Sequence, residues 1–205
     1  MEKNNEKFYS VVIPTMWKSN RILSMLNILE NSKYVKEIIL IDNNPEEKPN
    51  LSPSSKLIYY TENKNIFVNP AWNKGFELSN YDLILCNDDI EIPNIDDVLF
   101  LISKSEYDFI GISFEESSEL KILDIDIFPN NGYGSFIFVK NYIKIPEEYK
   151  IYKGDFILFQ NNEKKGVLYN PNLIGERSVT LKTDPKLYEI ARKDLINYKE
   201  KDFIK

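Results

Sequence analysis

Residues 81–90 read YDLILCNDDI, and this short stretch is the strongest indication of the fold. Its apolar run at residues 83–86 indicates a strand covered on both faces, as the strands of parallel sheets are. After Asn87 come two adjacent carboxylates, Asp88 and Asp89, which repel each other unless a cation or hydrogen-bond donors neutralise them. Because open α/β sheets bind ligands at the carboxyl ends of their strands, the stretch indicates a hard-cation site for Mg²⁺ or Mn²⁺. A solvated turn before Pro93 is the alternative that this stretch alone leaves open.

The composition restricts the class of protein. The chain has 205 residues, which fits one large domain or one domain with a small appendage. Its 28% charged content and the lack of a run of about 18 apolar residues argue against a membrane span. The net charge of −6 disfavours nucleic acid as a main partner, although a nucleotide-sized ligand remains possible. No signal peptide or anchor is evident, so we expect a cytoplasmic protein or a piece of a larger multi-domain enzyme.

The residue types exclude several kinds of catalysis. The chain contains no histidine, which excludes Ser-His-Asp and Cys-His mechanisms and zinc sites that use histidine. The single cysteine, Cys86, falls in the predicted strand, where a small buried hydrophobic residue is expected. Acid–base chemistry must therefore come from carboxylates, lysine or tyrosine.

The order of expected elements predicts an α/β fold. In the first half, strands are expected at residues 9–13, 37–41, 57–61 and 83–86, with helices after Asn20, from Pro70 to about residue 79, and after Asn94. This alternation predicts a parallel sheet with right-handed crossovers. In the second half we expect strands at 109–114, 120–127 and 135–139, a helix at 155–165 that ends at Gly166, and a final helix from Pro185.

We expect these elements to form a single domain over residues 1–205. A nucleotide-binding half would cover about residues 8–104, a mixed half about residues 105–183, and a C-terminal helix residues 184–205. Polar residues follow three strands of the first half, namely Pro14-Thr15, Asp42 and the triplet at 87–89. If the strands are parallel, these residues converge on one edge. Asp42 would then accept hydrogen bonds from a base or ribose, although a local turn is the simpler explanation of this residue alone.

Four motifs resemble those of a known family. The segments VVIPT (11–15), ILIDNN (39–44), NPAWNKG (69–75) and LCNDD (85–89) have the order and spacing found in GT-A-fold glycosyltransferases. They look most like the family-2-like group that uses nucleotide-diphosphate sugars, and the resemblance covers about residues 8–180. It implies a GT-A-like, mostly parallel nucleotide-binding sheet flanked by helices, with a mixed acceptor-side second half.

The resemblance also implies roles for individual residues. The last carboxylate of the Asp-x-Asp-type motif, Asp89, would bind Mn²⁺ or Mg²⁺, and Asp88 would lie near the ribose. Asn87 stands at the first position of that motif, so this copy is a variant. The other residues that the resemblance places around the nucleotide and diphosphate are Pro14, Thr15, Asp42, Asn69, Asn73 and Lys74.

The second half resembles the acceptor side of the family. The segment GYGSFIF (132–138) is similar to a Gly-rich strand below the donor sugar, although a hairpin turn explains its glycines equally well. The segment YKIYKGDF (149–156) is similar to the one that carries the catalytic base, which makes Asp155 the candidate base. On local grounds Asp155 could also be a helix cap. Residues 176–180 resemble a segment that closes over the diphosphate, with Arg177 as a possible phosphate contact.

Together these features predict a metal-dependent inverting glycosyltransferase. It would move a sugar from a nucleotide-diphosphate sugar, UDP-linked, to a hydroxyl of a glycan or protein-linked glycan. A sugar nucleotidyltransferase would need a Gly-rich, basic phosphate loop after the first strand, and PTMW (14–17) is not one. A non-catalytic sugar- or protein-binding domain is the other alternative, favoured by Asn87 and by the single carboxylate at Asp155.

Overall fold

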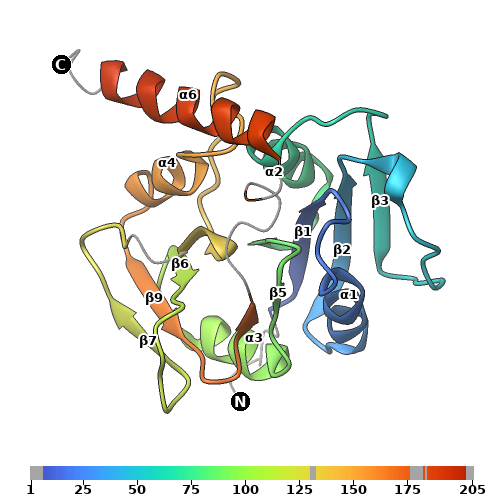
Figure 1. Cartoon of the computed structure of the whole chain (residues 1–205). Coiled ribbons are helices and arrows are strands. Elements are labelled where there is room, and N and C mark those ends of the chain that lie inside the picture. The colour runs from blue at the N-terminus through green and yellow to red at the C-terminus, as the bar shows by residue number, and fades with distance from the viewer. Residues whose placement is uncertain (1–6, 130–132, 176–181, 183, 202–205) are drawn as a thin grey trace.

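The computed structural model describes residues 7–129, 133–175, 182 and 184–201. Its centre is an eight-stranded sheet with strand order β3-β2-β1-β4-β8-β6-β9-β7 (Figure 1). The strands are β1 (Tyr9–Thr15), β2 (Val35–Asp42), β3 (Leu57–Thr61), β4 (Asp82–Cys86), β6 (Phe109–Ile112), β7 (Lys121–Asp124), β8 (Phe136–Val139) and β9 (Lys165–Tyr169). A separate two-stranded sheet pairs β5 (Ile90–Glu91) with β10 (Ile174–Gly175). The predicted α/β fold class is confirmed.

The four strands of the first half are parallel, as the sequence predicts. Thr15 is in register with Asp42, and Asp42 is in register with Thr61, so three strands end level with one another. Strand β8 runs antiparallel to β4 and pairs Phe136 with Cys86. The amino end of β8 therefore meets the carboxyl end of β4, and residues from both halves of the chain come to the same sheet edge.

Helices cover both faces of the sheet (Figure 1). Strand β1 shows the division, because Val11 and Ile13 pack with one core cluster and Val12 packs with the other. Helices α1 and α3 belong to the first cluster, and α2 and α4 to the second. The helices are α1 (Ile22–Asn31), α2 (Val68–Leu78), α3 (Ile95–Lys104), α4 (Gly154–Gln160) and α6 (Pro185–Lys201), with short 3₁₀ turns η1 (Pro45–Glu47) and η2 (Tyr133–Ser135). None of the helices in the described ranges is long and apolar enough to cross a membrane.

One part of the second half differs from the prediction. The helix expected at residues 155–165 ends at Gln160, and residues 165–169 form strand β9, which the sequence pattern did not reveal. Asn161 is the C-cap of the helix, and Asn162 donates through Nδ2 to the carbonyl of Leu158 in its last turn. Strand β9 then pairs with β6 on one side and β7 on the other. Both partners lie far away in sequence, so a local pattern could not distinguish this short apolar run from the end of a helix.

Candidate active site

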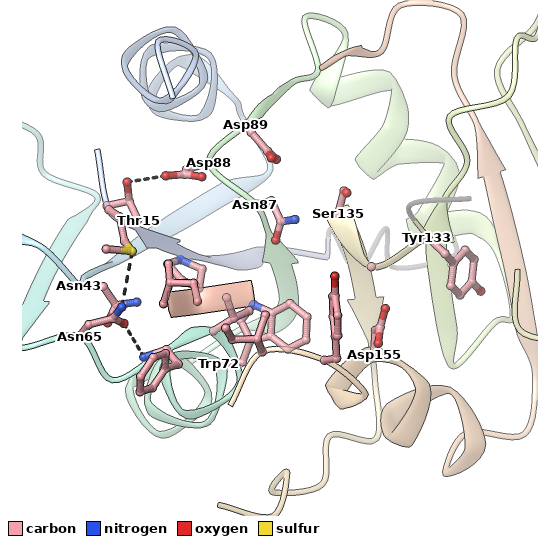
Figure 2. Close-up of a pocket in the computed structure, with 18 of the residues that line it drawn as sticks. Thr15, Asn43, Asn65, Trp72, Asn87, Asp88, Asp89, Tyr133, Ser135 and Asp155 are labelled. Carbon is pink, nitrogen blue, oxygen red and sulfur yellow. Dashed lines mark hydrogen bonds between the residues drawn. The ribbon is translucent and has the colours of Figure 1, made fainter. Parts of the chain in front are cut away.

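A cleft of about 320 Å³ opens at the edge where the parallel strands end (Figure 2). Its walls come from both halves of the chain: the ends of β1 and β4, the start of α2, the turn η2, the segment before α4, and α6. Five of the predicted site residues line this cleft, namely Pro14, Thr15, Asp88, Asp89 and Asp155. Four do not, namely Asp42, Asn69, Asn73 and Lys74.

The end of β4 brings two carboxylates into the cleft. Thr15 donates from Oγ1 to Asp88 Oδ2 at 2.6 Å and accepts a hydrogen bond from the Trp17 backbone N–H at 2.9 Å. Burial raises the pKa of Asp88 to about 6, and the neighbouring Asp89 adds to this effect, while the hydrogen bond from Thr15 opposes it. Asp89 is 5% exposed and also lines the cleft. The chain therefore holds two adjacent carboxylates at the end of β4, and burial disfavours the charge of Asp88.

The charge of the cleft bears on which ligand it can hold. Three carboxylates, those of Asp88, Asp89 and Asp155, line the described part of the cleft, and no lysine or arginine does so there. Within the same described residues there is no cluster of three or more Asp, Glu, Cys or His side chains suited to a metal ion. Mg²⁺ and Mn²⁺ commonly take only one or two carboxylates and complete their shell with phosphate and water. The residues present therefore fit a divalent cation that arrives with a diphosphate.

Two asparagines and an aromatic residue shape the wall near Thr15. Asn43 Oδ1 accepts from the Ile66 backbone N–H at 3.0 Å, and Asn65 Oδ1 accepts from the Phe67 N–H at 2.8 Å. These bonds hold Phe67 with φ 68° and ψ 175°, a conformation that side-chain-bearing residues rarely adopt. Asn65 also donates to Met16 Sδ at 3.5 Å (Figure 2). The sequence pattern does not indicate Asn65 and Phe67 as site residues, because the loop that carries them has no periodic pattern.

Asp42 lies at the carboxyl end of β2, as predicted, but its carboxylate has local partners. Tyr59 donates from its hydroxyl to Oδ2 at 2.6 Å, and the Asn44 backbone N–H donates to Oδ1 at 2.8 Å. Burial, together with this hydrogen bond, raises the pKa of Tyr59 to about 12. The turn at residues 42–44 is the local one that the sequence left open. Its neighbour Asn43, rather than Asp42, lines the cleft.

Helix α2 presents two adjacent faces with different tasks. Val68 and Trp72, four residues apart, line the cleft. Asn73 lies on the neighbouring face, where its Oδ1 accepts from the Tyr142 hydroxyl at 2.8 Å and its Nδ2 donates to the Ile145 carbonyl at 2.9 Å. Lys74 pairs with Glu77 at 3.2 Å, outside the cleft. Helical spacing within the NPAWNKG motif is enough to assign these residues to different faces of the helix. It does not indicate which face lies against the cleft.

Asp155 forms the other end of the cleft. Figure 2 shows its carboxylate on the side away from Thr15 and Asp88. The Phe156 backbone N–H donates to Asp155 Oδ1 at 2.9 Å. A Cβ atom on Gly134 would lie 2.4 Å from Asp155 Oδ2, so the missing side chain at Gly134 makes room for this carboxylate. Burial raises the pKa of Asp155 above the ordinary range of an aspartate, which increases its affinity for a proton.

Two further segments, η2 and α6, contribute to this end of the cleft. Ser135 lines the cleft and accepts at its carbonyl from the Asn87 backbone N–H at 2.8 Å, which joins η2 to the end of β4. Leu187 of α6 also lines the cleft, so the C-terminal helix belongs to the site. Gly132 and Arg177 lie outside the described residues.

No family model matches the chain, and no curated protein matches it. Solved structures do resemble it. The fragment 1–349 of TarS from S. aureus in complex with UDP has a TM-score of 0.57 and 16% identity over 80% of this chain and 60% of that one. The same fragment with UDP-GlcNAc has a TM-score of 0.58 and 16% identity over 89% of this chain and 64% of that one. Longer TarS gives a TM-score of 0.58 over 89% of this chain and 38% of that one. The chain thus spans less than two thirds of the TarS structures that it matches, and it has their GT-A-like fold.

Proposed function

We propose that this chain is a metal-dependent glycosyltransferase that moves a sugar, with inversion, from a UDP-linked donor to a hydroxyl of a glycan or protein-linked glycan. One observation carries the proposal. A single cleft at the carboxyl edge of the sheet holds a buried carboxylate pair, Asp88 and Asp89, at one end and a third carboxylate, Asp155, at the other. The complexes of TarS with UDP and UDP-GlcNAc, which share the fold, support a nucleotide-sugar as the donor.

The donor end of the cleft would hold the nucleotide diphosphate. Asp89 would bind Mn²⁺ or Mg²⁺, which supplies charge neutralisation to the departing diphosphate. Thr15 holds the Asp88 carboxylate through its hydroxyl, and in the proposed complex Asp88 lies on the ribose side. The wall of Pro14, Met16, Asn43 and Phe67 would enclose the nucleoside.

The other end of the cleft would activate the acceptor. Asp155 would take the proton from the acceptor hydroxyl while the oxygen of that hydroxyl forms a bond to the anomeric carbon of the donor sugar. The bond from that carbon to the diphosphate oxygen breaks on the opposite face of the sugar, and its electron pair leaves with the diphosphate. The raised pKa of Asp155 makes it a better proton acceptor than an exposed aspartate would be. Gly134 would keep the space beside this carboxylate open.

Calorimetry with UDP-, GDP- and dTDP-sugars, with and without Mn²⁺, tests the donor side. We expect Mn²⁺-dependent binding of a UDP-sugar. We expect the variant Asp89→Asn to lose that metal dependence, because a neutral amide binds a divalent cation more weakly than a carboxylate does. A matched control is Asp82→Asn, which removes an exposed carboxylate at the opposite end of the same strand. A wild-type chain that binds no donor in the presence of metal would overturn the proposal.

The same preparations test the acceptor side. We expect Asp155→Asn to bind donor as the wild type does and to lose transfer by about 10²- to 10⁴-fold, the usual contribution of a general base. Normal transfer by this variant would place the base elsewhere. Donor binding without transfer by the wild type, across a panel of glycan acceptors, would favour a non-catalytic binding domain.

A further inference from the structure

The carboxylate of Asp194, on the C-terminal helix α6, is buried against main-chain donors. It is 1% exposed. Three successive backbone N–H groups donate to it: that of Lys150 lies 3.1 Å from both oxygens, that of Ile151 2.6 Å from Oδ2, and that of Tyr152 2.9 Å from Oδ2. Hydrogen bonds to a carboxylate are stronger than those to a neutral acceptor. Asp194 therefore holds residues 150–152, which we call the wall segment, firmly against α6.

The opposite side of the wall segment is held by helix α2. Asn69 donates from its backbone N–H to the Lys150 carbonyl at 3.0 Å and from Nδ2 to the Tyr152 carbonyl at 2.9 Å. Asn69 is fully buried, and a Cβ atom on Gly154 would lie 2.2 Å from its Oδ1. The segment's donors are thus taken by α6 and two of its acceptors by α2, so its backbone is held from both sides.

The wall segment leads directly to the candidate base. Ile151 and Tyr152 line the cleft, and Asp155 follows in the first turn of α4. Between them Lys153 has φ 71°, a left-handed conformation that ends the segment and turns the chain into the helix. Asp155 itself accepts from the adjacent Phe156 backbone N–H. Its place in the cleft therefore depends on the backbone that precedes it.

We propose that Asp194 and Asn69 are positioning residues for the transfer reaction: by holding the wall segment from α6 and α2, they fix Asp155 against Gly134 and facing the acceptor. This inference rests on the proposed function. It gives α6 a role in the reaction although its residue Asp194 does not line the cleft. An apolar contact could hold α6 in place but would leave three partly buried N–H groups without these acceptors.

The test is to compare Asp194→Asn with Glu189→Gln, which removes an exposed carboxylate from the same helix. UDP with Mn²⁺ is the probe for folded sites, because it occupies the donor end of the cleft. The neutral amide oxygen that Asp194→Asn introduces accepts these three hydrogen bonds more weakly than the carboxylate, and its NH₂ group replaces the oxygen that also accepts from Lys150, so we expect the base to be displaced. We expect turnover per UDP-binding site to fall about 10- to 100-fold, because a small misplacement of a reacting group causes a loss of this size. The Kd for UDP and the number of sites stay within twofold of the wild type.

A second variant keeps the test decisive if Asp194→Asn does not fold. Asn69→Ala removes the side-chain bond to the Tyr152 carbonyl and keeps the backbone bond to the Lys150 carbonyl, and we expect turnover per site to fall about tenfold with UDP binding retained. Turnover per site within twofold of wild type in the folded variants would overturn the inference. So would a loss of UDP-binding sites that accounts for all of the lost turnover, because that is the result of a purely structural role. A wild-type chain that binds UDP but transfers no sugar, or binds no nucleotide, instead contradicts the proposed function.

Discussion

At the scale of single residues, the cleft holds carboxylates in positions from which water is largely excluded. Asp88 and Asp89 are adjacent in sequence and both buried, and the hydrogen bond from Thr15 offsets only part of the cost for Asp88. A cation would relieve this cost, and so would protonation of Asp88. The metal-free protein should therefore show a stability that depends on the charge state of Asp88.

The change Asp88→Asn tests this dependence. Asp88 has a folded pKa of about 6 against an ordinary value of 3.8, so the folded state binds the proton more tightly and stability falls as pH rises through this range. At pH 7 the ionised group costs about 3 kcal/mol. We expect Asp88→Asn to raise the free energy of unfolding of the metal-free protein at pH 7 by up to about that amount, and to bring no gain near pH 4.

Urea unfolding in the presence of a chelator, at pH 4 and pH 7, measures this difference. The control is Asp82→Asn, which removes an exposed carboxylate from the same strand. A difference between Asp88→Asn and wild type that is the same at both pH values would contradict the assignment.

Among the helices and strands, helix α2 organises the site by using adjacent faces. Val68 and Trp72 form part of the cleft, whereas Asn69 and Asn73 tie the helix to residues 145–152. The helix reaches the sheet through Gly75, where an added Cβ would lie 2.2 Å from Val12 Cγ1. Close approach of α2 to β1 therefore depends on the absence of a side chain at this position.

The change Gly75→Ala tests this packing. In an isolated helix alanine would be the more favourable residue by about 1 kcal/mol, so a stabilising effect is the simple expectation from sequence. The contact with Val12 reverses the sign, and we expect a loss of about 1–3 kcal/mol in the free energy of unfolding. Urea unfolding of Gly75→Ala, of Val12→Ala and of the double variant that combines them tests whether this contact is the cause. The double variant should lose less than the two single losses together, and additive losses would show that the contact is not responsible.

In the molecule as a whole, the two halves of the chain share one sheet. Strand β8, from the second half, lies between β4 and β6 and pairs with both. The cleft uses residues from β1 to α6. Without the other half, each half would lack hydrogen bonds between sheet strands and part of the cleft. This arrangement supports a single domain.

Scanning calorimetry tests this organisation. We expect one transition with equal calorimetric and van't Hoff enthalpies, because the shared sheet couples both halves. For a chain of 205 residues the enthalpy near 60 °C should be about 140 kcal/mol. UDP with Mn²⁺ should raise the midpoint of the whole transition. Two separate transitions, only one of which moves with ligand, would show that the halves unfold as independent domains.

Local sequence pattern was sufficient to predict the first half of the fold and the carboxylates at its sheet edge. Buried parallel strands are continuous apolar runs, and their ends are marked by polar residues, so Thr15 and the pair Asp88 and Asp89 could be placed from this pattern. The candidate base Asp155 came from a resemblance of motifs, and the structure places it in the same cleft. These features depend on residues that are close together in the chain.

The remaining features arise from contacts between distant parts of the chain. Strand β9 exists because β6 and β7 flank it, and neither partner is its neighbour in sequence. Asn69 does not line the cleft, and it donates hydrogen bonds to the backbone of residues 150–152 instead. Asp194 is connected to the cleft only through the same segment, more than forty positions earlier in the chain. A side chain's role depends on which distant backbone packs against it, and that information is not contained in the local periodicity of the chain.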